Sequence, residues 1–145
     1  MYCLDANVWV YFLDEGLPEH EAVVDSVSPI LSDEPVFTTT VLQMEVVHYL
    51  TNQLADSERV VERFLSIENC TVADLTTEDV RTGAGLLAEY DEVGIGGRDG
   101  TVLAAMDRYD VSRLWTHDSG LVEMGERLDW LDVTDPVSTA DDPER

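Results

Sequence analysis

The chain has 145 residues, enough for one domain with its own core, and 44% of them are hydrophobic, an ordinary share for a globular protein. Its 31 acidic residues stand against eight basic residues, all arginine, which gives a net charge of −23. The absence of lysine argues against a P-loop, no apolar run approaches the ~20 residues of a membrane span, and the two cysteines make no disulfide framework.

The acidic excess indicates adaptation to a salt-rich cytoplasm. Like charges oppose a compact fold at low salt, whereas at about 1 M salt the Debye length is about 3 Å and the repulsion is screened. The acids are spread along the whole chain, which favours this interpretation over nucleic-acid mimicry or an acidic surface for a basic partner. Asp5 interrupts the N-terminal apolar run, which has no basic leader, so we expect no signal peptide and a cytoplasmic, membrane-free protein.

The first half of the chain alternates short apolar runs with helical periodicity. The segment 1–6 is expected to be a buried strand, and the helix that follows it (7–14) can be capped by Asn7. A helix over 19–31 is expected to end near Pro29, which lacks a backbone N–H. The remaining expected elements are a strand over 35–38, a helix over 38–54, and a helix over 56–67 with Asp56 as its N-cap.

The second half repeats this alternation. The helix expected over 76–91 contains Gly83 and Gly85, each of which weakens it by roughly 1 kcal/mol relative to alanine. The tail 134–145 is polar and proline-containing, so we expect it to be disordered and the folded domain to span 1–133. The other expected elements are strands over 70–75, 113–118 and 128–133, and helices over 98–110 and 119–127.

This alternation predicts an α/β fold, a three-layer α/β/α sandwich around a mostly parallel five-stranded sheet. Such sheets bind ligands outside the C-terminal ends of their strands, near a switch in strand order. Asp5 would stand at such a strand end.

Four acids lie at the edges of apolar elements and not in runs of charge, although any one of them could be a solvated surface group: Asp5, Glu45, Asp99 and Asp118. Taken singly, Asp99 could be a helix N-cap and Asp118 a turn residue. Taken together, carboxylates that converge in a low-dielectric cleft are unfavourable unless a cation is present. Oxygen ligands suit Mg²⁺ or Mn²⁺ better than zinc or copper.

Four stretches in order resemble the motifs of PIN-domain ribonucleases, and most closely the VapC-type toxins of toxin–antitoxin pairs. They are "LDANVWVYFL", "TTVLQMEVVHYL", "RDGTVLAAM" and "LWTHDSGL", and the resemblance covers about residues 1–133. Two positions depart from the family pattern: Gly100 stands where alanine is common, and His117 precedes the last acid where a basic residue is common.

The resemblance implies endonucleolytic hydrolysis of RNA with Mg²⁺ or Mn²⁺. Asp5 and Asp99 would be direct ligands, Asp118 a ligand or a water-mediated partner, and Glu45 a holder of a second ion or of the attacking water; one ion or two stays open. Asn7 and Thr116 would support the cluster. Arg98 is either a phosphate contact or the partner of a surface acid.

The resemblance also implies a VapB-type antitoxin as partner and a homodimer or a larger complex with it. The apolar helix around Trp9 and Phe12, together with the 19–31 helix, would supply the interaction surface. Two alternatives remain open: a housekeeping PIN nuclease in ribosomal RNA maturation, and a non-catalytic PIN-like module whose acids are structural.

Overall fold

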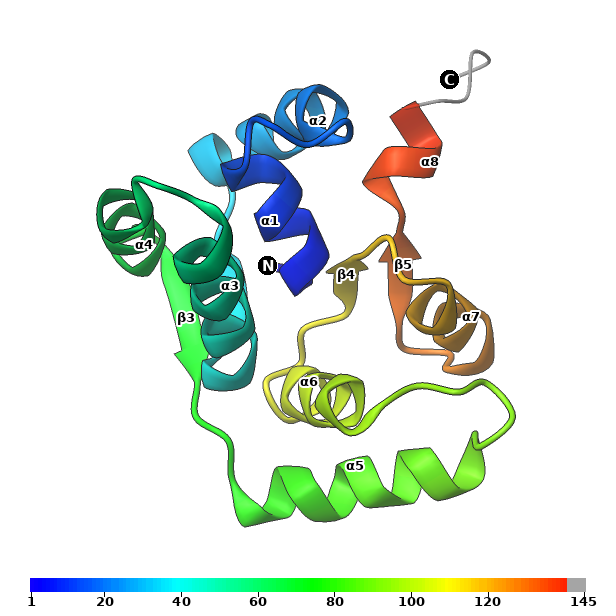
Figure 1. Cartoon of the computed structure of the whole chain (residues 1–145). Coiled ribbons are helices and arrows are strands. Elements are labelled where there is room, and N and C mark those ends of the chain that lie inside the picture. Colours follow the sequence, from blue (N-terminus) through cyan, green and yellow to red (C-terminus); the bar gives the residue numbers. More distant parts are fainter. Residues whose placement is uncertain (141–145) are drawn as a thin grey trace.

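A computed structural model describes residues 1–140 as a parallel β-sheet covered by helices (Figure 1). The strands lie in the order β3-β2-β1-β4-β5, and every neighbouring pair is parallel. The predicted five-stranded α/β architecture is therefore confirmed, with a sheet that is parallel throughout. The strands are β1 (Tyr2–Leu4), β2 (Val36–Thr39), β3 (Cys70–Ala73), β4 (Arg113–Trp115) and β5 (Asp132–Thr134).

The helices connect and cover these strands. Helices α1–α4 pack on one face of the sheet, α6 and α7 pack on the other, and α5 packs against α6. The helices described in residues 1–140 are α1 (Ala6–Leu13), α2 (His20–Asp33), α3 (Thr40–Gln53), α4 (Ser57–Leu65), α5 (Thr77–Glu89), α6 (Gly97–Arg108), α7 (Ser119–Arg127) and α8 (Pro136–Ala140).

Two apolar clusters, one on each face of the sheet, form the core. Because successive strand residues point to opposite faces, Cys3 joins the cluster beneath α6 and α7, while Leu4 joins the cluster beneath α1–α4. Trp9 is 1% exposed and packs against Phe64 with ring centroids 5.1 Å apart. The apolar character of the first helix thus arises in part from core packing.

Two predicted helix boundaries were wrong. The N-cap of α1 is Asp5 and not Asn7: the Asp5 carboxylate accepts a hydrogen bond from the Ala6 N–H at 2.8 Å. Helix α2 does not end near Pro29 but continues to Asp33. Pro29 lies on the exposed side of α2, and the helix around it still buries Val27 and Ile30, which offsets the one backbone hydrogen bond lost at proline.

The C-terminal part of the chain also differs from the expected boundaries. Residues 128–131 form a turn after α7, with the Leu131 N–H donating to the Leu128 carbonyl, so the last strand is confined to β5. Helix α8 occupies the start of the tail that the sequence led us to expect to be disordered. The remainder of that tail, 141–145, lies outside the described residues.

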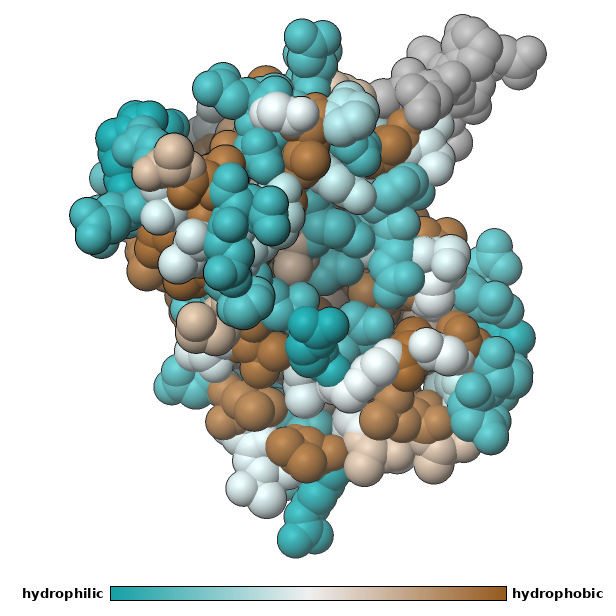
Figure 2. Space-filling model, viewed as in Figure 1, coloured by the Kyte–Doolittle hydropathy of each residue, from teal (hydrophilic) through white to brown (hydrophobic). Residues whose placement is uncertain are grey.

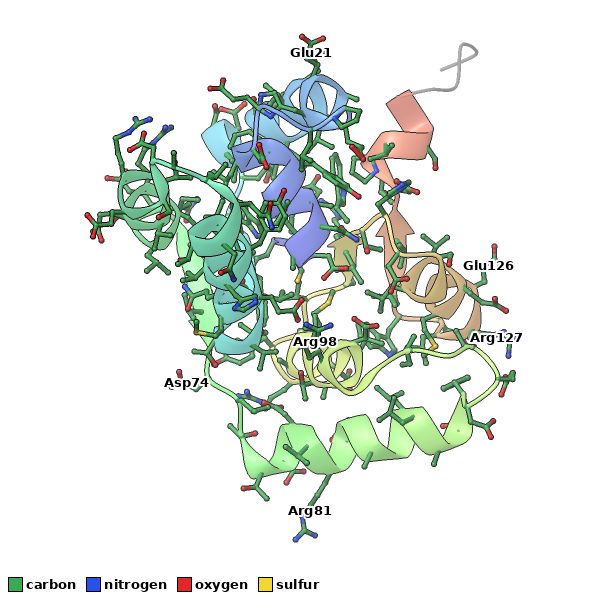
Figure 3. All side chains as sticks on the ribbon, viewed as in Figure 1. Glu21, Asp74, Arg81, Arg98, Glu126 and Arg127 are labelled. Carbon is green, nitrogen blue, oxygen red and sulfur yellow. The ribbon has the colours of Figure 1, made fainter. Side chains whose placement is uncertain are left out.

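The surface is rich in charge, with an apolar area over α5 and the adjacent part of α3 (Figure 2). Glu21, Arg81 and Glu126 project outward from their helices, whereas Arg98 lies between α3 and α6 (Figure 3). Cys3 and Cys70 are both free thiols. Among residues 1–140, no helix combines the length and apolar character that crossing a bilayer requires.

Candidate active site

The strand order reverses beside β1, and the candidate site lies where β1 and β4 end next to each other. The chain runs from β1 outward to β2 and β3, and then returns to place β4 on the other side of β1. The Asp5 N–H donates to the Trp115 carbonyl at 2.9 Å, which ties the end of β1 to the end of β4. Asp5 follows β1 directly, and Thr116 to Asp118 follow β4, as expected for a crevice at a topological switch point.

Asp5 is the most deeply buried carboxylate of the site, with 8% of the residue exposed. Burial raises its pKa, the charge of Asp118 raises it further, and hydrogen bonds from Thr116 and the Ala6 N–H oppose this shift. The Thr116 hydroxyl donates to Asp5 Oδ2 at 2.6 Å. Asp5 is therefore held in one orientation by the fold before any ligand arrives.

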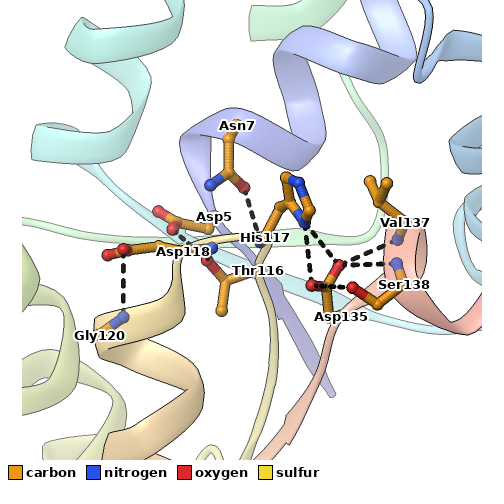
Figure 4. A network of polar contacts seen from close by, with 9 residues as sticks. All are labelled: Asp5, Asn7, Thr116, His117, Asp118, Gly120, Asp135, Val137 and Ser138. Carbon is orange, nitrogen blue, oxygen red and sulfur yellow. Dashed lines mark hydrogen bonds and ion pairs between the residues drawn. The ribbon is translucent and has the colours of Figure 1, made fainter.

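Thr116 links Asp5 to the loop that carries Asp118 (Figure 4). Its Oγ1 accepts a hydrogen bond from the Asp118 N–H at 3.0 Å, so one buried hydroxyl orients both acids. Asp118 is the N-cap of α7 and accepts from the Gly120 N–H at 3.3 Å. The Asn7 side-chain oxygen accepts from the His117 N–H at 3.3 Å, which joins α1 to the same loop.

Asp99 approaches this cluster from the first turn of α6, where its carboxylate accepts from the Gly96 N–H at 3.4 Å. Burial and then the charges of Asp5, Asp118 and Glu45 raise the pKa of Asp99 to about 6, against the opposing Gly96 hydrogen bond. Asp99 thus lies within reach of the charges of the other three predicted acids, because each of them contributes to the shift in its pKa.

Glu45 reaches the cluster from α3. Burial raises its pKa, the Arg98 guanidinium opposes the rise, and the charge of Asp5 adds to it. Arg98 Nη1 lies 3.4 Å from Glu45 Oε2. Arg98 thus forms an ion pair in the RNA-free protein, with a site acid and not a surface acid as its partner, and its contact with a phosphate stays a prediction.

Helix N-termini surround the cluster and partly stabilise its negative charge. Asp5 caps α1, Asp118 caps α7, and Asp99 lies in the first turn of α6. The partial positive charge of a helix N-terminus favours carboxylates by about 0.3–1 kcal/mol each at exposed sites. Burial and the charges of neighbouring acids nevertheless raise the pKa values of Asp5 and Asp99.

The carboxylate oxygens of these four acids suit a hard divalent cation. Their side chains do not, however, converge on a single point. Carboxylates that raise one another's pKa are stabilised when a cation neutralises them. Within the described part of the chain, no group of three or more histidine, cysteine, aspartate or glutamate side chains is arranged tightly enough to hold an ion as it stands. Small rotamer changes at half-buried Glu45 and Asp99 would alter the positions of their oxygens without moving the backbone, and the charges of these acids already raise one another's pKa.

A largely apolar groove adjoins the acids and has a volume of about 870 Å³. Its walls come from α1 and α3, and Asn7, Glu45 and Arg98 line the end nearest the cluster. Residues of α2, which the sequence led us to expect on an interaction surface, do not line this groove in the described structure; Leu17, before α2, does. His48 also lines it, as a neighbour of the site.

One contact near the site had no signal in the sequence. His117 Nδ1 lies 2.9 Å from Asp135 Oδ2, and Asp135 also accepts from the Val137 and Ser138 N–H groups at the start of α8 (Figure 4). The pair ties the C-terminal helix to the loop that carries Asp118. Asp135 lies in the segment expected to be disordered, so only the packing of α8 reveals its role.

The fold and the acids at its switch point define a class of α/β proteins that act at the carboxyl ends of parallel strands. A model of the PIN domain matches residues 2–127, and the chain belongs to the PIN domain family. This confirms the family resemblance read from the four motifs. The comparison with curated protein sequences gives no match.

Solved structures similar to this fold include FitAcB, VapC20 and DNA-bound VapBC. FitAcB from Neisseria gonorrhoeae matches with a TM-score of 0.68 and 19% identity over 94% of this chain and 98% of its own. VapC20 of Mycobacterium tuberculosis, described as a toxin that cleaves the sarcin–ricin loop, matches with a TM-score of 0.68 and 16% identity over 84% and 95%. DNA-bound VapBC from Salmonella typhimurium matches with a TM-score of 0.63 and 19% identity over 93% and 97%. At these identities the likeness concerns the fold.

Proposed function

We propose that the protein is a metal-dependent endoribonuclease and the toxin of a type II toxin–antitoxin pair. The proposal rests on four acids near the ends of β1 and β4, whose charges act on one another. The pKa values of Asp5, Glu45 and Asp99 are raised, and the charge of Asp118 contributes to the shifts at Asp5 and Asp99. PIN nucleases generally use divalent metals, and the solved structures with this fold include toxins.

Each residue of the cluster has a role that follows from its place. Asp5 and Asp99 would be the direct ligands of Mg²⁺ or Mn²⁺, because they are the most strongly coupled acids. Asp118 would complete the ligand set directly or through water. Glu45, on α3, would hold a second ion or the attacking water. A bound divalent ion lowers the pKa of water and neutralises charge that develops on the phosphate.

Two polar side chains would support this chemistry without binding the ion. Thr116 orients Asp5 through its 2.6 Å hydrogen bond. Asn7 lines the groove and uses its oxygen to accept from the His117 N–H, so its amide N–H groups are the part suited to a phosphate oxygen. A negatively charged protein can still bind RNA at such a site, since the ion reverses the local field.

The groove beside the acids supports a VapB-type antitoxin as the partner. Its apolar walls between α1 and α3 suit an amphipathic segment, and its end opens on the carboxylates. A basic side chain of the antitoxin, placed there, would take the position of the ion and block RNA hydrolysis. The similarity in fold to VapBC complexes supports this assignment.

Apolar side chains exposed near the β3 edge of the sheet support a homodimer or a larger complex with the antitoxin. Val72, Leu75 and Val80 are 41%, 46% and 51% exposed, and β3 is an edge strand. Exposed apolar groups of this kind favour association. Val80→Glu should shift the mass measured by light scattering towards the monomer.

RNA cleavage by the purified chain tests the enzymatic proposal. Total RNA is incubated at high salt with and without Mg²⁺ or Mn²⁺, and the new ends are mapped. We expect discrete metal-dependent cuts by the wild type and none by Asp99→Asn. Absence of any cleavage by a folded protein that binds the ion would favour a non-catalytic module; cuts confined to ribosomal RNA precursors would favour RNA maturation.

The antitoxin proposal has a separate test in the groove wall. Met44 lines the groove and is 61% exposed, so Met44→Asp should weaken binding of an antitoxin encoded beside this chain while RNA cleavage persists. Leu65 on α4, 47% exposed and outside the groove, provides the matched control Leu65→Asp. Equal antitoxin affinity of both variants would contradict the groove assignment.

A further inference from the structure

Arg98 occupies a position that the local structure of α6 disfavours. It is the second residue of that helix, where the partial positive charge of the helix N-terminus repels a cation. Its side chain is 72% exposed, so core packing does not demand it. When a residue breaks a local rule without a gain in packing, a functional site is the usual reason.

The ion pair of Arg98 links it to the carboxylate cluster. Among residues 1–140, no other arginine pairs with a site acid: Arg59, Arg108 and Arg127 form their ion pairs elsewhere. Glu45, its partner, is 23% exposed and faces the same groove. The positive charge also lowers the pKa of Asp5, so Arg98 acts on more than one member of the cluster.

The pair is suited to exchange. A largely exposed guanidinium held at 3.4 Å by one carboxylate oxygen contributes little to stability and can leave at low cost. Its planar donors match a phosphate as well as a carboxylate. A divalent ion that needs Glu45 would compete for the same oxygen.

We propose that Arg98 is a built-in counter-cation of the site: it neutralises Glu45 before metal binding, competes with the divalent ion for that carboxylate, and contacts an RNA phosphate once the ion has displaced it. This inference rests on the proposed nuclease function and adds a role in which one side chain opposes metal binding and assists substrate binding.

The two roles predict opposite effects of a single substitution. Arg98→Gln removes the competing charge, so Mn²⁺ should bind the RNA-free protein about 3–10-fold more tightly. The same change removes the phosphate contact, so at saturating Mn²⁺ the KM for RNA should rise about 10-fold with little change in kcat. A side chain with a purely structural role would not move these two quantities in opposite senses.

The experiment measures Mn²⁺ affinity by calorimetry at fixed KCl concentration, and RNA cleavage separately. Arg81→Gln is the matched control, because it makes the same change in net charge on the outer side of α5, away from the acids (Figure 3). Arg98→Lys should keep an affinity close to wild type. In a Glu45→Gln background, Arg98→Gln should no longer tighten Mn²⁺ binding, because the carboxylate for which Arg98 and the ion compete is absent.

The outcomes separate this inference from the proposed function. If the wild type binds Mn²⁺ and cleaves RNA but Arg98→Gln leaves the Mn²⁺ affinity unchanged or weaker, the counter-cation role is overturned and the nuclease proposal stands. A tightening equal to that of Arg81→Gln would also overturn it, as an effect of net charge alone. If the wild type neither binds Mn²⁺ nor cleaves RNA, the proposed function itself fails.

Discussion

At the scale of single residues, Asp5 is both a helix cap and a member of the acidic cluster. Asp5→Asn keeps a side chain that caps helices well but removes a charged ligand. We expect a loss of RNA cleavage of at least about 10²-fold, since changes beyond the ligand shell already cost 10–100-fold. The metal-free protein should melt no earlier than wild type, because one of several repelling carboxylates is gone.

Asp5→Ala is the informative companion variant. It loses the hydrogen bond to the Ala6 N–H as well as the charge, so it should be less stable than Asp5→Asn by about 1 kcal/mol in urea unfolding. Melting curves with and without Mn²⁺ check the assignment. Wild-type stabilisation of Asp5→Asn by Mn²⁺ would mean that Asp5 does not hold the ion.

Asp99 gives the site a pH dependence with a definite sign. Its pKa is about 6 in the folded protein against an ordinary value of 3.8, so the folded state holds the proton more tightly than the unfolded state. The stability that this proton contributes is complete below pH 3.8 and is lost as the pH rises through 6. Asp99→Asn should therefore raise the melting temperature of the metal-free protein at pH 7.5 and leave it unchanged below pH 3.8. A gain of equal size at both pH values would contradict this.

The positions of these acids at the ends of elements were predictable from the sequence, whereas several of their contacts were not. Asp5, Asp99 and Asp118 each stand where a strand or loop meets a helix, and parallel strands bring such positions to one edge. The pairing of Arg98 with Glu45 depends instead on how α6 packs beside α3, and no local pattern encodes it. The sequence also did not reveal that Asp5 caps α1 as well as belonging to the acidic cluster, because asparagine is as good an N-cap as aspartate and Asn7 was available.

At the scale of elements, the close approach of α5 and α6 gives Gly83 and Gly85 different surroundings, although helix propensity predicts the same effect for both. A Cβ at Gly83 would lie 3.1 Å from the backbone carbon of Gly100, whereas a Cβ at Gly85 would meet nothing within 4 Å. Gly85→Ala should stabilise the protein by about 0.8–1 kcal/mol through helix propensity. Gly83→Ala should destabilise it by roughly 1–3 kcal/mol, because a backbone contact cannot be relieved by a rotamer change.

Urea unfolding of the two variants decides this, with Gly85→Ala as the control for helix propensity. Equal stabilisation by both would show that α5 can move away from α6 without cost. The contact also explains why glycine at position 100 suits this chain, since a Cβ there would lie 3.3 Å from the Gly83 carbonyl oxygen. Helix and strand types followed from periodicity, but such helix–helix distances and the continuation of α2 through Pro29 are set by tertiary packing.

At the scale of the whole molecule, a chain with a net charge of −23 keeps most of the charged side chains of residues 1–140 at least partly exposed. Within these residues few polar side chains are buried, among them Asp5 and Asp79, and Asp79 is matched by a bidentate contact to Arg108 at 2.8–2.9 Å. Composition could predict this exposed acidic surface, because ionised side chains are rarely buried unless paired. It could not predict which acids would be the exceptions, Asp5 at the site and Asp79 beside Arg108.

The acidic surface predicts that salt stabilises the protein. Raising KCl from dilute to molar concentration shortens the Debye length from about 10 Å at 0.1 M to about 3 Å at 1 M, so repulsion between surface acids should fall and the melting temperature should rise. Because salts can also strengthen apolar burial, the control is a variant with exposed acids neutralised, such as Glu21→Gln combined with Glu126→Gln, two side chains that project into solvent. This variant should be more stable at low salt, and its melting temperature should rise less steeply with KCl. A slope equal to that of the wild type would assign the salt effect to apolar burial, and a flat or falling wild-type melting temperature would contradict adaptation to a salt-rich cytoplasm.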